Sequence, residues 1–390
     1  MTISNQLPSA EPDLLPESAA AISPPTTHTI SFTGSGSEYF RIWIVNLCLT
    51  MATLGIYSAW AKVRRLQYFD RNTQLDGASF NFHGRPLAIL KGRLIALVLL
   101  ICYHYAFGFS KLFGMTVITI LFLALPAMLR SALRFRLKNT SYRGVRFDFA
   151  GDLIGAYTCF APLLAVLLMP AILVGVFPGR PILLVVVCVG LYLSWPVIHA
   201  MIKRYQHTGL EYGDQKTTYR ASNFSLIKPY ALAFLAGIGV VIVISILSGL
   251  FFAGVAAATQ AGAAADSWTY GVGILIGVLY VYAAFLISGP FLQIRIWNLV
   301  WNNTSFPGFT IQSTLKFWPF LELQTVNIVL TLLTLGLYRP FAVVRIYRYR
   351  MQHMTVTGDG FAQIGQGQHS QYSAASGDSS ADFLDIDLSF

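Results

Sequence analysis

Charged side chains are scarce in this sequence. Asp, Glu, Lys and Arg make up 11% of its 390 residues, whereas they make up roughly 25% of an average soluble domain. Hydrophobic residues make up 55% and the mean hydropathy is +0.58. A soluble core cannot bury that much apolar side chain, so the composition predicts a protein that resides in a membrane.

Common catalytic and metal-binding motifs are also missing. The sequence has no GxSxG, HExxH or Walker A motif, which leaves hydrolase, zinc protease and nucleotide-binding readings without support. Its four cysteines, Cys48, Cys102, Cys159 and Cys188, show no CxxC spacing, so zinc and disulfide frameworks are not indicated. We expect no enzymatic activity, no metal and no cofactor.

The net charge of +10 does not indicate a nucleic-acid partner, because the basic residues are not gathered into one domain with stacking aromatics. They lie between apolar runs instead. Six of these runs are long enough, or nearly so, to span a bilayer. They are Leu94 to Phe109, Leu112 to Leu129, Leu153 to Phe177, Ile182 to Met201, Tyr230 to Ala256, and Tyr270 to Leu292.

The six runs group into three hairpins with short, nearly uncharged links. Of the 27 Lys and Arg residues, only Lys111 and Arg180 fall in those links, and the others lie in or beyond the connections between hairpins. Lys and Arg near helix ends are retained in the cytoplasm, so the pattern predicts that these connections are cytoplasmic. The runs contain no Asp or Glu, which argues against a proton pump of the carboxylate kind.

The two ends of the chain differ from its middle in composition. Residues 1–28 are rich in Pro, Ser and Ala and have no apolar core of a signal peptide. Residues 361–390 are rich in Gln, Ser, Gly and Asp. We expect both to be disordered tails in the cytoplasm, the second acidic, flanking a membrane domain over residues 29–360.

Two further apolar segments, Phe40 to Tyr57 and Phe320 to Tyr338, resemble each other within the related ranges 39–69 and 320–350. Identical residues recur 281 positions apart, including the Thr-Leu-Gly triplets at Thr53 and Thr334. Full crossings by both segments would place one basic flank outside, against the charge bias. We therefore favour re-entrant segments that break at the Gly, and full spans remain the alternative.

A second similarity runs through the basic connections. Asn72-Thr73, Asn139-Thr140 and Asn303-Thr304 are each followed by a Gly four residues after the Thr, and alternating sequences such as Phe80-Asn-Phe82 suggest short strands. We interpret each unit as a helix bent or ended near a proline, a basic extension, a turn and a strand. The units are either separate loops and helix ends, or similar cytoplasmic elements packed into one collar.

Polar side chains follow one face of each Thr-Leu-Gly segment. Asn and Thr at spacings i, i+4 and i+7 share a helix face, and such residues either hydrogen-bond to neighbouring helices or line a polar site between repeats. Arg41 and Glu322 also stand 281 positions apart and form a candidate ion pair, the alternative being that each is solvated. The candidate polar site comprises Asn46, Thr50, Thr53, Asn327, Thr331 and Thr334.

Several strings of the first segment resemble the YjgN-like family of bacterial inner-membrane proteins. They are Phe32-Thr-Gly34, Thr53-Leu-Gly-Ile-Tyr57, Trp60-Ala-Lys-Val-Arg64 and Asn72-Thr73. The resemblance runs from about Ile30 to Gly358 and departs at Ala59, where we expect Pro in the family. It implies a multi-pass protein of the bacterial inner membrane and no known activity.

The sequence therefore predicts an all-α polytopic helix bundle with internal repeats. It would contain six transmembrane helices, two Thr-Leu-Gly segments and short cytoplasmic β elements. The leading functional hypothesis is transport or binding of a small solute or lipid. The alternative is a structural or interaction protein whose basic cytoplasmic face binds anionic lipid headgroups or a protein partner.

Overall fold

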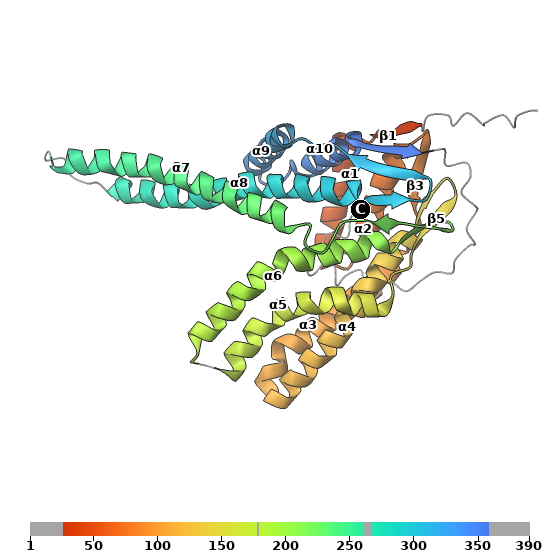
Figure 1. The fold of residues 1–390 in the computed structure, drawn as a ribbon, viewed down its shortest axis with the longest axis horizontal. Coiled ribbons are helices and arrows are strands. Elements are labelled where there is room, and N and C mark those ends of the chain that lie inside the picture. The colour runs from red at the N-terminus through yellow and green to blue at the C-terminus, as the bar shows by residue number, and fades with distance from the viewer. Residues whose placement is uncertain (1–25, 178, 261–266, 359–390) are drawn as a thin grey trace, which may run out of the picture.

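The computed structural model describes residues 26–177, 179–260 and 267–358. In these residues it contains ten helices and eleven strands, with the strands gathered at one end of the molecule (Figure 1). The helices are α1 (Gly36–Ala52), α2 (Ser58–Asn72), α3 (Pro86–Phe109), α4 (Lys111–Lys138), α5 (Leu153–Val176), α6 (Pro181–Thr208), α7 (Ile227–Gln260), α8 (Ser267–Asn302), α9 (Phe317–Leu333) and α10 (Arg339–Gln352).

All eleven strands of the described chain belong to one antiparallel sheet. Its order is β7-β6-β5-β4-β3-β2-β1-β11-β10-β9-β8, and only Thr217 separates the two end strands, so the sheet almost closes on itself. The strands are β1 (Thr27–Phe32), β2 (Thr73–Leu75), β3 (Ala78–Phe82), β4 (Thr140–Tyr142), β5 (Val145–Phe149), β6 (Leu210–Tyr212), β7 (Gln215–Lys216), β8 (Thr218–Tyr219), β9 (Thr304–Phe306), β10 (Phe309–Ser313) and β11 (Met354–Gly358).

The nearly closed sheet shows that the predicted all-α fold is wrong. The expected short strands are present, but they join into a single continuous sheet rather than remaining local elements. Partners such as β3 and β4 are separated in sequence by the two helices α3 and α4. Local alternation reveals a strand but not its distant partner, which is why the sequence pattern did not predict the sheet.

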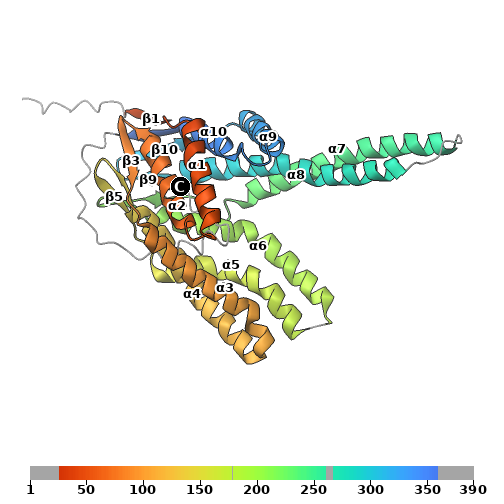
Figure 2. The ribbon, with the colours of Figure 1, turned by 180° about the vertical axis from the view of Figure 1, so that it is seen from behind.

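Helices and strands alternate in five units around a ring. Helix pairs α1–α2, α3–α4, α5–α6, α7–α8 and α9–α10 are connected through the sheet, and each pair also contacts the next pair along the chain. The ring closes where α10 packs on α1 and where β11 pairs with β1 (Figure 2). Because β1 and β11 are neighbours, the two ends of the described chain leave the ring side by side.

The Asn-Thr pairs end the helices that lead into the sheet. The Asn72 side-chain amide donates to the Tyr68 carbonyl (2.8 Å), and the Thr73 hydroxyl donates to the Phe69 carbonyl (2.8 Å). Asn139 and Asn303 make the same contact to the carbonyl four residues earlier. The last carbonyls of a helix lack intrahelical donors, so the Thr hydroxyl satisfies one of them, and the Asn amide adds a side-chain donor to the carbonyl one residue earlier, where the strand begins.

Two-residue turns then reverse the chain. Asp76 and Gly77 both have positive φ, 47° and 72°, as do Arg143 and Gly144, 48° and 80°. This pair of left-handed residues is typical of the tight turn whose twist matches that of a β-hairpin. Each unit therefore returns its strand directly to the next helix pair.

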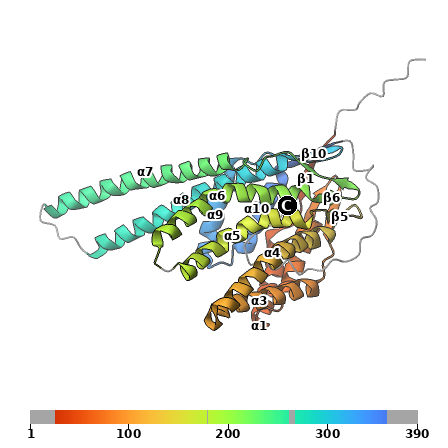
Figure 3. The same ribbon diagram turned by 60° about the horizontal axis from the view of Figure 1, so that its bottom comes forward.

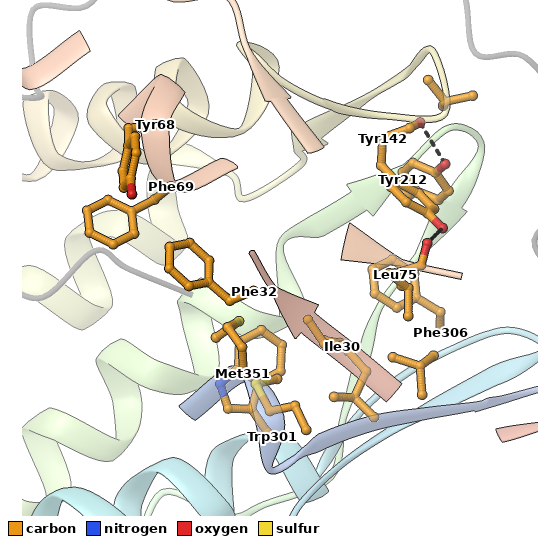
Figure 4. Packing of buried hydrophobic residues seen from close by; sticks show 14 of the residues in the cluster. Ile30, Phe32, Tyr68, Phe69, Leu75, Tyr142, Tyr212, Trp301, Phe306 and Met351 are labelled. Carbon is orange, nitrogen blue, oxygen red and sulfur yellow. Dashed lines mark hydrogen bonds between the residues drawn. The ribbon is translucent and has the colours of Figure 1, made fainter. Parts of the chain in front are cut away.

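Aromatic and aliphatic side chains fill the core between the sheet and the adjoining helix ends (Figure 4). Tyr142 and Tyr212 are 2% and 3% exposed, and their hydroxyls donate to the Leu75 and Tyr142 carbonyls, respectively, at 2.7 and 3.0 Å. These bonds join β2, β4 and β6 across the core. Buried phenols thus find acceptors on neighbouring strands, which removes the cost of burying a polar hydroxyl.

Five helices are long and apolar enough to cross a membrane by length and composition: α3, α4, α6, α7 and α8. Helix α5, the remaining member of the six predicted spans, runs over 24 residues from Leu153 to Val176, and within it the shorter apolar helix Leu153–Val166 lies in the described part of the chain. Helices α4, α6 and α8 continue through Pro126, Pro196 and Pro290, so they do not end at these prolines. The long hairpins leave the sheet on one side (Figure 3).

The predicted tails lie almost wholly outside the described residues. Thr27 and His28, assigned to the first tail, form the start of β1. The second tail, 361–390, lies entirely outside.

Candidate functional site

Each Thr-Leu-Gly segment forms a turn at the tip of a short helix hairpin. Helix α1 ends at Ala52, Leu54 and Gly55 have φ of 48° and 92°, and α2 then returns along α1. Leu335 and Gly336 adopt φ of 50° and 93° between α9 and α10. The break expected at the Gly is therefore present at both places.

The threonines of the candidate polar site donate hydrogen bonds within their own hairpins. Thr50 donates to the Asn46 carbonyl and Thr331 to the Asn327 carbonyl, both at 2.6 Å. Thr53 donates to the Leu49 carbonyl (2.8 Å). Their role in the structure is to satisfy carbonyls near the ends of α1 and α9, as expected for threonines in apolar helices.

The last threonine of each segment also accepts a hydrogen bond across the turn. The Thr53 hydroxyl accepts from the Tyr57 backbone N–H, and the Thr334 hydroxyl accepts from the Tyr338 N–H, both at 2.9 Å. Each hydroxyl thus bridges the end of one helix and the start of the next. This contact fixes the direction in which the chain turns back.

The two stripes do not meet as one polar site in the described structure. Helix α10 packs against both α1 and α9, and the threonines of each segment hydrogen-bond within their own hairpin. Asn46 and Asn327 are nevertheless buried, with 7% and 3% of their surfaces exposed. The two asparagines differ in the hydrogen-bond partners of their side chains.

Asn327 is hydrogen-bonded on both sides of its amide. Its nitrogen donates to the Ala342 carbonyl (3.5 Å), and its oxygen accepts from the Arg345 guanidinium (3.3 Å). The same guanidinium donates to the Tyr338 hydroxyl (2.9 Å). Arg345 and Tyr338 are site residues that the polar stripe did not predict, although their recurrence 281 positions after Arg64 and Tyr57 is visible in the sequence.

The Asn46 side-chain oxygen is buried without a hydrogen-bond partner. Leaving a buried acceptor unsatisfied costs about 1–3 kcal/mol. The corresponding arginine, Arg64, lies instead over the ring of Tyr57, with its guanidinium carbon 5.7 Å from the ring centroid. The two hairpins thus carry the same three residues in two arrangements.

Arg41 and Glu322 lie in the second turns of α1 and α9, and both are exposed. Among the residues that the structure describes, no ion pair joins them. The candidate pairing is therefore not assembled in this arrangement.

Apolar side chains at the hairpin tips are strongly exposed. Leu54 and Leu335 each have 94% of their surface exposed, and Met51 and Leu333 have 70% and 75%. Exposed apolar groups of this size at one projecting tip mark a membrane or interaction surface. Both tips carry them.

A partly buried carboxyl lies where α2 meets the core. Desolvation raises the pKa of Asp70 to about 6, although the nearby Arg136 guanidinium acts in the opposite direction. The Tyr347 hydroxyl, close enough for Asp70 to affect its pKa, shares a hydrogen bond of 2.9 Å with Thr73. No group of three or more His, Cys, Asp or Glu that could hold a metal is present in residues 26–177, 179–260 and 267–358.

Curated relatives carry membrane-protein names. The chain is 27% identical over 366 residues to "Inner membrane protein YjgN" of Salmonella typhimurium, covering 85% of this chain and 89% of that protein. It is 23% identical over 369 residues to proteins of the same name from Escherichia coli O157:H7 and strain K12, with the same coverage. No solved structure matches the chain.

The names and the five apolar helices together support a membrane protein, and the resemblance seen in the sequence is confirmed. A family model described as bacterial proteins of unknown function (DUF898) matches residues 27–383. The chain belongs to this family.

Proposed function

We propose that the protein is a multi-pass, non-enzymatic protein of the bacterial inner membrane that binds anionic phospholipid through its basic face. The turns from α3 to α4 and from α5 to α6 lie far from the sheet (Figure 1). Lys111, the first residue of α4, and Arg180, just before α6, belong to these turns. The other 25 of the 27 Lys and Arg residues lie in the sheet and the connections beside it, in the nearer parts of the long helices or in the short hairpins. This separation of charge is the observation that carries the proposal.

The same separation supports an orientation. With the sheet in the cytoplasm, the basic helix ends meet the inner leaflet and the nearly uncharged turns of the long hairpins meet the periplasm. In this orientation, the pairing of β1 with β11 supports a cytoplasmic position for both ends of the described chain. The short hairpins insert their apolar tips into the inner leaflet as re-entrant elements, with protein on one side to cover them.

We also propose that the hairpins α1–α2 and α9–α10 are copies of one unit. Residues 281 positions apart share their backbone turn and their threonine hydrogen bonds. The capping contacts of Asn72, Asn139 and Asn303 extend this similarity to other units of the ring.

Lipid binding is favoured over solute transport by the state of the polar stripes. A solute path needs polar groups that are available to a solute, whereas the stripe threonines donate to carbonyls of their own helices. A cation near an anionic membrane surface contributes about 1 kcal/mol. A face with many cations is therefore suited to hold anionic headgroups.

Native mass spectrometry of the purified full-length protein in micelles tests the proposal. Phosphatidylglycerol and phosphatidylcholine with the same acyl chains are titrated separately. We expect clear preference for phosphatidylglycerol and loss of that preference at high salt, because salt screens surface charge. Equal binding of the two lipids would contradict the proposed function.

A further inference from the structure

The α9–α10 hairpin holds an arginine within itself. Arg345 donates to the Asn327 side-chain oxygen (3.3 Å) and to the Tyr338 hydroxyl (2.9 Å), so its guanidinium bridges the two helices and the turn. Asn327 is almost fully buried, and Arg345 is partly buried. The Asn327 oxygen and the Tyr338 hydroxyl thus both accept from this one guanidinium.

The α1–α2 hairpin has the same three residues without that arrangement. Arg64 is exposed and lies over the Tyr57 ring, while the Asn46 oxygen that would accept it is buried and has no partner. Arg64 therefore does not make the contact to the buried asparagine that Arg345 makes in the second hairpin. The arginine is turned outward, where a ligand can reach it.

The two arginines differ in their neighbours along the helix. Lys62 and Arg65 flank Arg64, whereas Val343 and Ile346 occupy the corresponding positions beside Arg345. Arg93 of α3 adds a further cation, since its guanidinium donates to the hydroxyl of Ser58 at the start of α2. The first hairpin thus has cations directly beside Arg64, whereas the other arginines of α10 stand further from Arg345 along the helix, and two of them have partners elsewhere: Arg348 donates to the Gly34 carbonyl and Arg350 lies over the Trp297 ring.

Apolar groups complete the surface around this charge. Leu54, Ile56 and Met51 at the adjacent tip have 94%, 57% and 70% of their surfaces exposed. Arginine forms strong, directional hydrogen bonds with phosphate oxygens. A ligand that satisfies both the cations and the apolar tip has a phosphate joined to hydrocarbon chains.

We propose that the α1–α2 hairpin binds the phosphate of an anionic phospholipid on Arg64, flanked by Lys62 and Arg65, with the acyl chains beside the exposed tip. Asn46 is then an internal acceptor that competes with the phosphate for Arg64, as Asn327 holds Arg345 in the second hairpin. The inference deepens the proposed lipid-binding function and rests on it. It assigns the site to one of two similar hairpins.

The second hairpin provides matched controls for the test. Phosphatidylglycerol is titrated into the full-length protein in micelles, and bound lipid is counted by native mass spectrometry. We expect Arg64→Ala to weaken the tightest binding step by roughly tenfold, the loss of one charge-assisted contact. Arg345→Ala should leave that step unchanged, because Arg345 is held by Asn327 and Tyr338.

A second pair of variants keeps both arginines. Asn46→Asp places a carboxylate at the internal position, so it should capture Arg64 and weaken lipid binding, whereas Asn327→Asp should not. If Arg64→Ala fails to fold, the comparison of these two asparagine variants tests the site instead. Similar effects of the two arginine variants, or of the two asparagine variants, would overturn the assignment to this hairpin.

The outcomes separate this site from the general function. Wild-type protein that does not distinguish phosphatidylglycerol from phosphatidylcholine contradicts the proposed function itself. Preference for phosphatidylglycerol that survives in Arg64→Ala leaves that function standing and overturns this site. Displacement of the lipid by inorganic phosphate at equal concentration would show that the site takes free phosphate, which also overturns the proposal.

Discussion

Asn46 and Asn327 are the same side chain in two hydrogen-bonding environments. One has a buried oxygen without a partner, and the other accepts from Arg345. The effect of a buried polar group on the stability of the fold depends on its hydrogen-bond partners more than on the residue type. Identical residues at corresponding positions therefore have different predicted effects on stability.

Replacing each asparagine by leucine tests this difference. Asn327→Leu removes two contacts and leaves the Arg345 guanidinium without its buried acceptor, which should cost about 1–3 kcal/mol. Asn46→Leu removes an unsatisfied oxygen and should be neutral or stabilising. Thermal unfolding in detergent micelles compares the two, and a larger loss of Tm in Asn46→Leu would contradict the assigned hydrogen bonds.

Asp70 gives a prediction about pH. Burial raises its pKa in the folded state from 3.8 to about 6, so the folded protein binds the proton more tightly than the unfolded chain does. The stabilisation from this group is fully present below about pH 4, near the pKa of an unfolded Asp, and is lost as the pH rises through about 6. The neutral variant Asp70→Asn should therefore raise Tm above pH 6 and have less effect near pH 4. The same Tm difference at both pH values would contradict the pKa shift.

At the scale of elements, the Thr-Leu-Gly hairpins depend on a backbone that most residues avoid. Gly55 and Gly336 have φ of 92° and 93°, in the region that favours glycine. Their positions let α2 and α10 return along α1 and α9. The tip geometry, rather than contacts of the glycine itself, makes the residue necessary, since a Cβ at either would meet nothing within 4 Å.

Gly55→Ala should therefore destabilise the protein by roughly 1 kcal/mol or more, through backbone strain alone. Gly190→Ala is the matched control, because Gly190 lies inside α6 and a Cβ there also has open space. Alanine favours a helix over glycine, so the control should be neutral or stabilising. Thermal unfolding of the two variants makes the comparison, and equal losses would argue against the strained turn.

The helical elements and the turn at the Gly were predictable from the sequence because their signals are local. Apolar runs, the Thr-Leu-Gly break and the alternating pattern of Phe80-Asn-Phe82 each lie within a few residues. The partner of each strand lies beyond a helix pair, as β4 does for β3. Pairing over such separations has no local signature, so the sheet was missed.

The residues of the candidate site were predictable from the sequence, but their hydrogen-bond partners were not. Recurrence at 281 positions identified Asn46, Asn327 and their threonines. Whether a buried asparagine contacts its own hairpin or the other one depends on how the ring closes, and that is decided by β1, β11 and the packing of α10 on α1. The Arg345 contact depends on the packing of α10 against α9 within the second hairpin.

At the scale of the whole molecule, the ring is closed by strands from opposite ends of the chain. Thr27 of β1 faces Thr357 of β11, and their hydroxyls are 3.4 Å apart. Cysteines at these two positions, in a chain whose four natural cysteines are replaced, should form an intramolecular disulfide on mild oxidation. Gel mobility under non-reducing conditions reports the bond.

A pair one strand further apart is the control for ring closure. Thr357 faces Thr310 on its other side, so Thr27 and Thr310 are separated by two strand spacings, about 10 Å. Cysteines at Thr27 and Thr310 should not cross-link within the chain. Cross-linking of this pair without the first would show a different strand order.

The orientation of the ring in the membrane is the central claim, and labelling of single cysteines in intact cells tests it most directly. In a chain without natural cysteines, Lys111→Cys and Arg180→Cys probe the distant turns, and Asp76→Cys and Arg143→Cys probe the sheet. With a membrane-impermeant maleimide, we predict labelling of the first pair in intact cells and of the second pair only after the inner membrane is opened. Labelling of the sheet positions from outside would contradict a cytoplasmic sheet, and with it the proposed contact between the basic face and the inner leaflet.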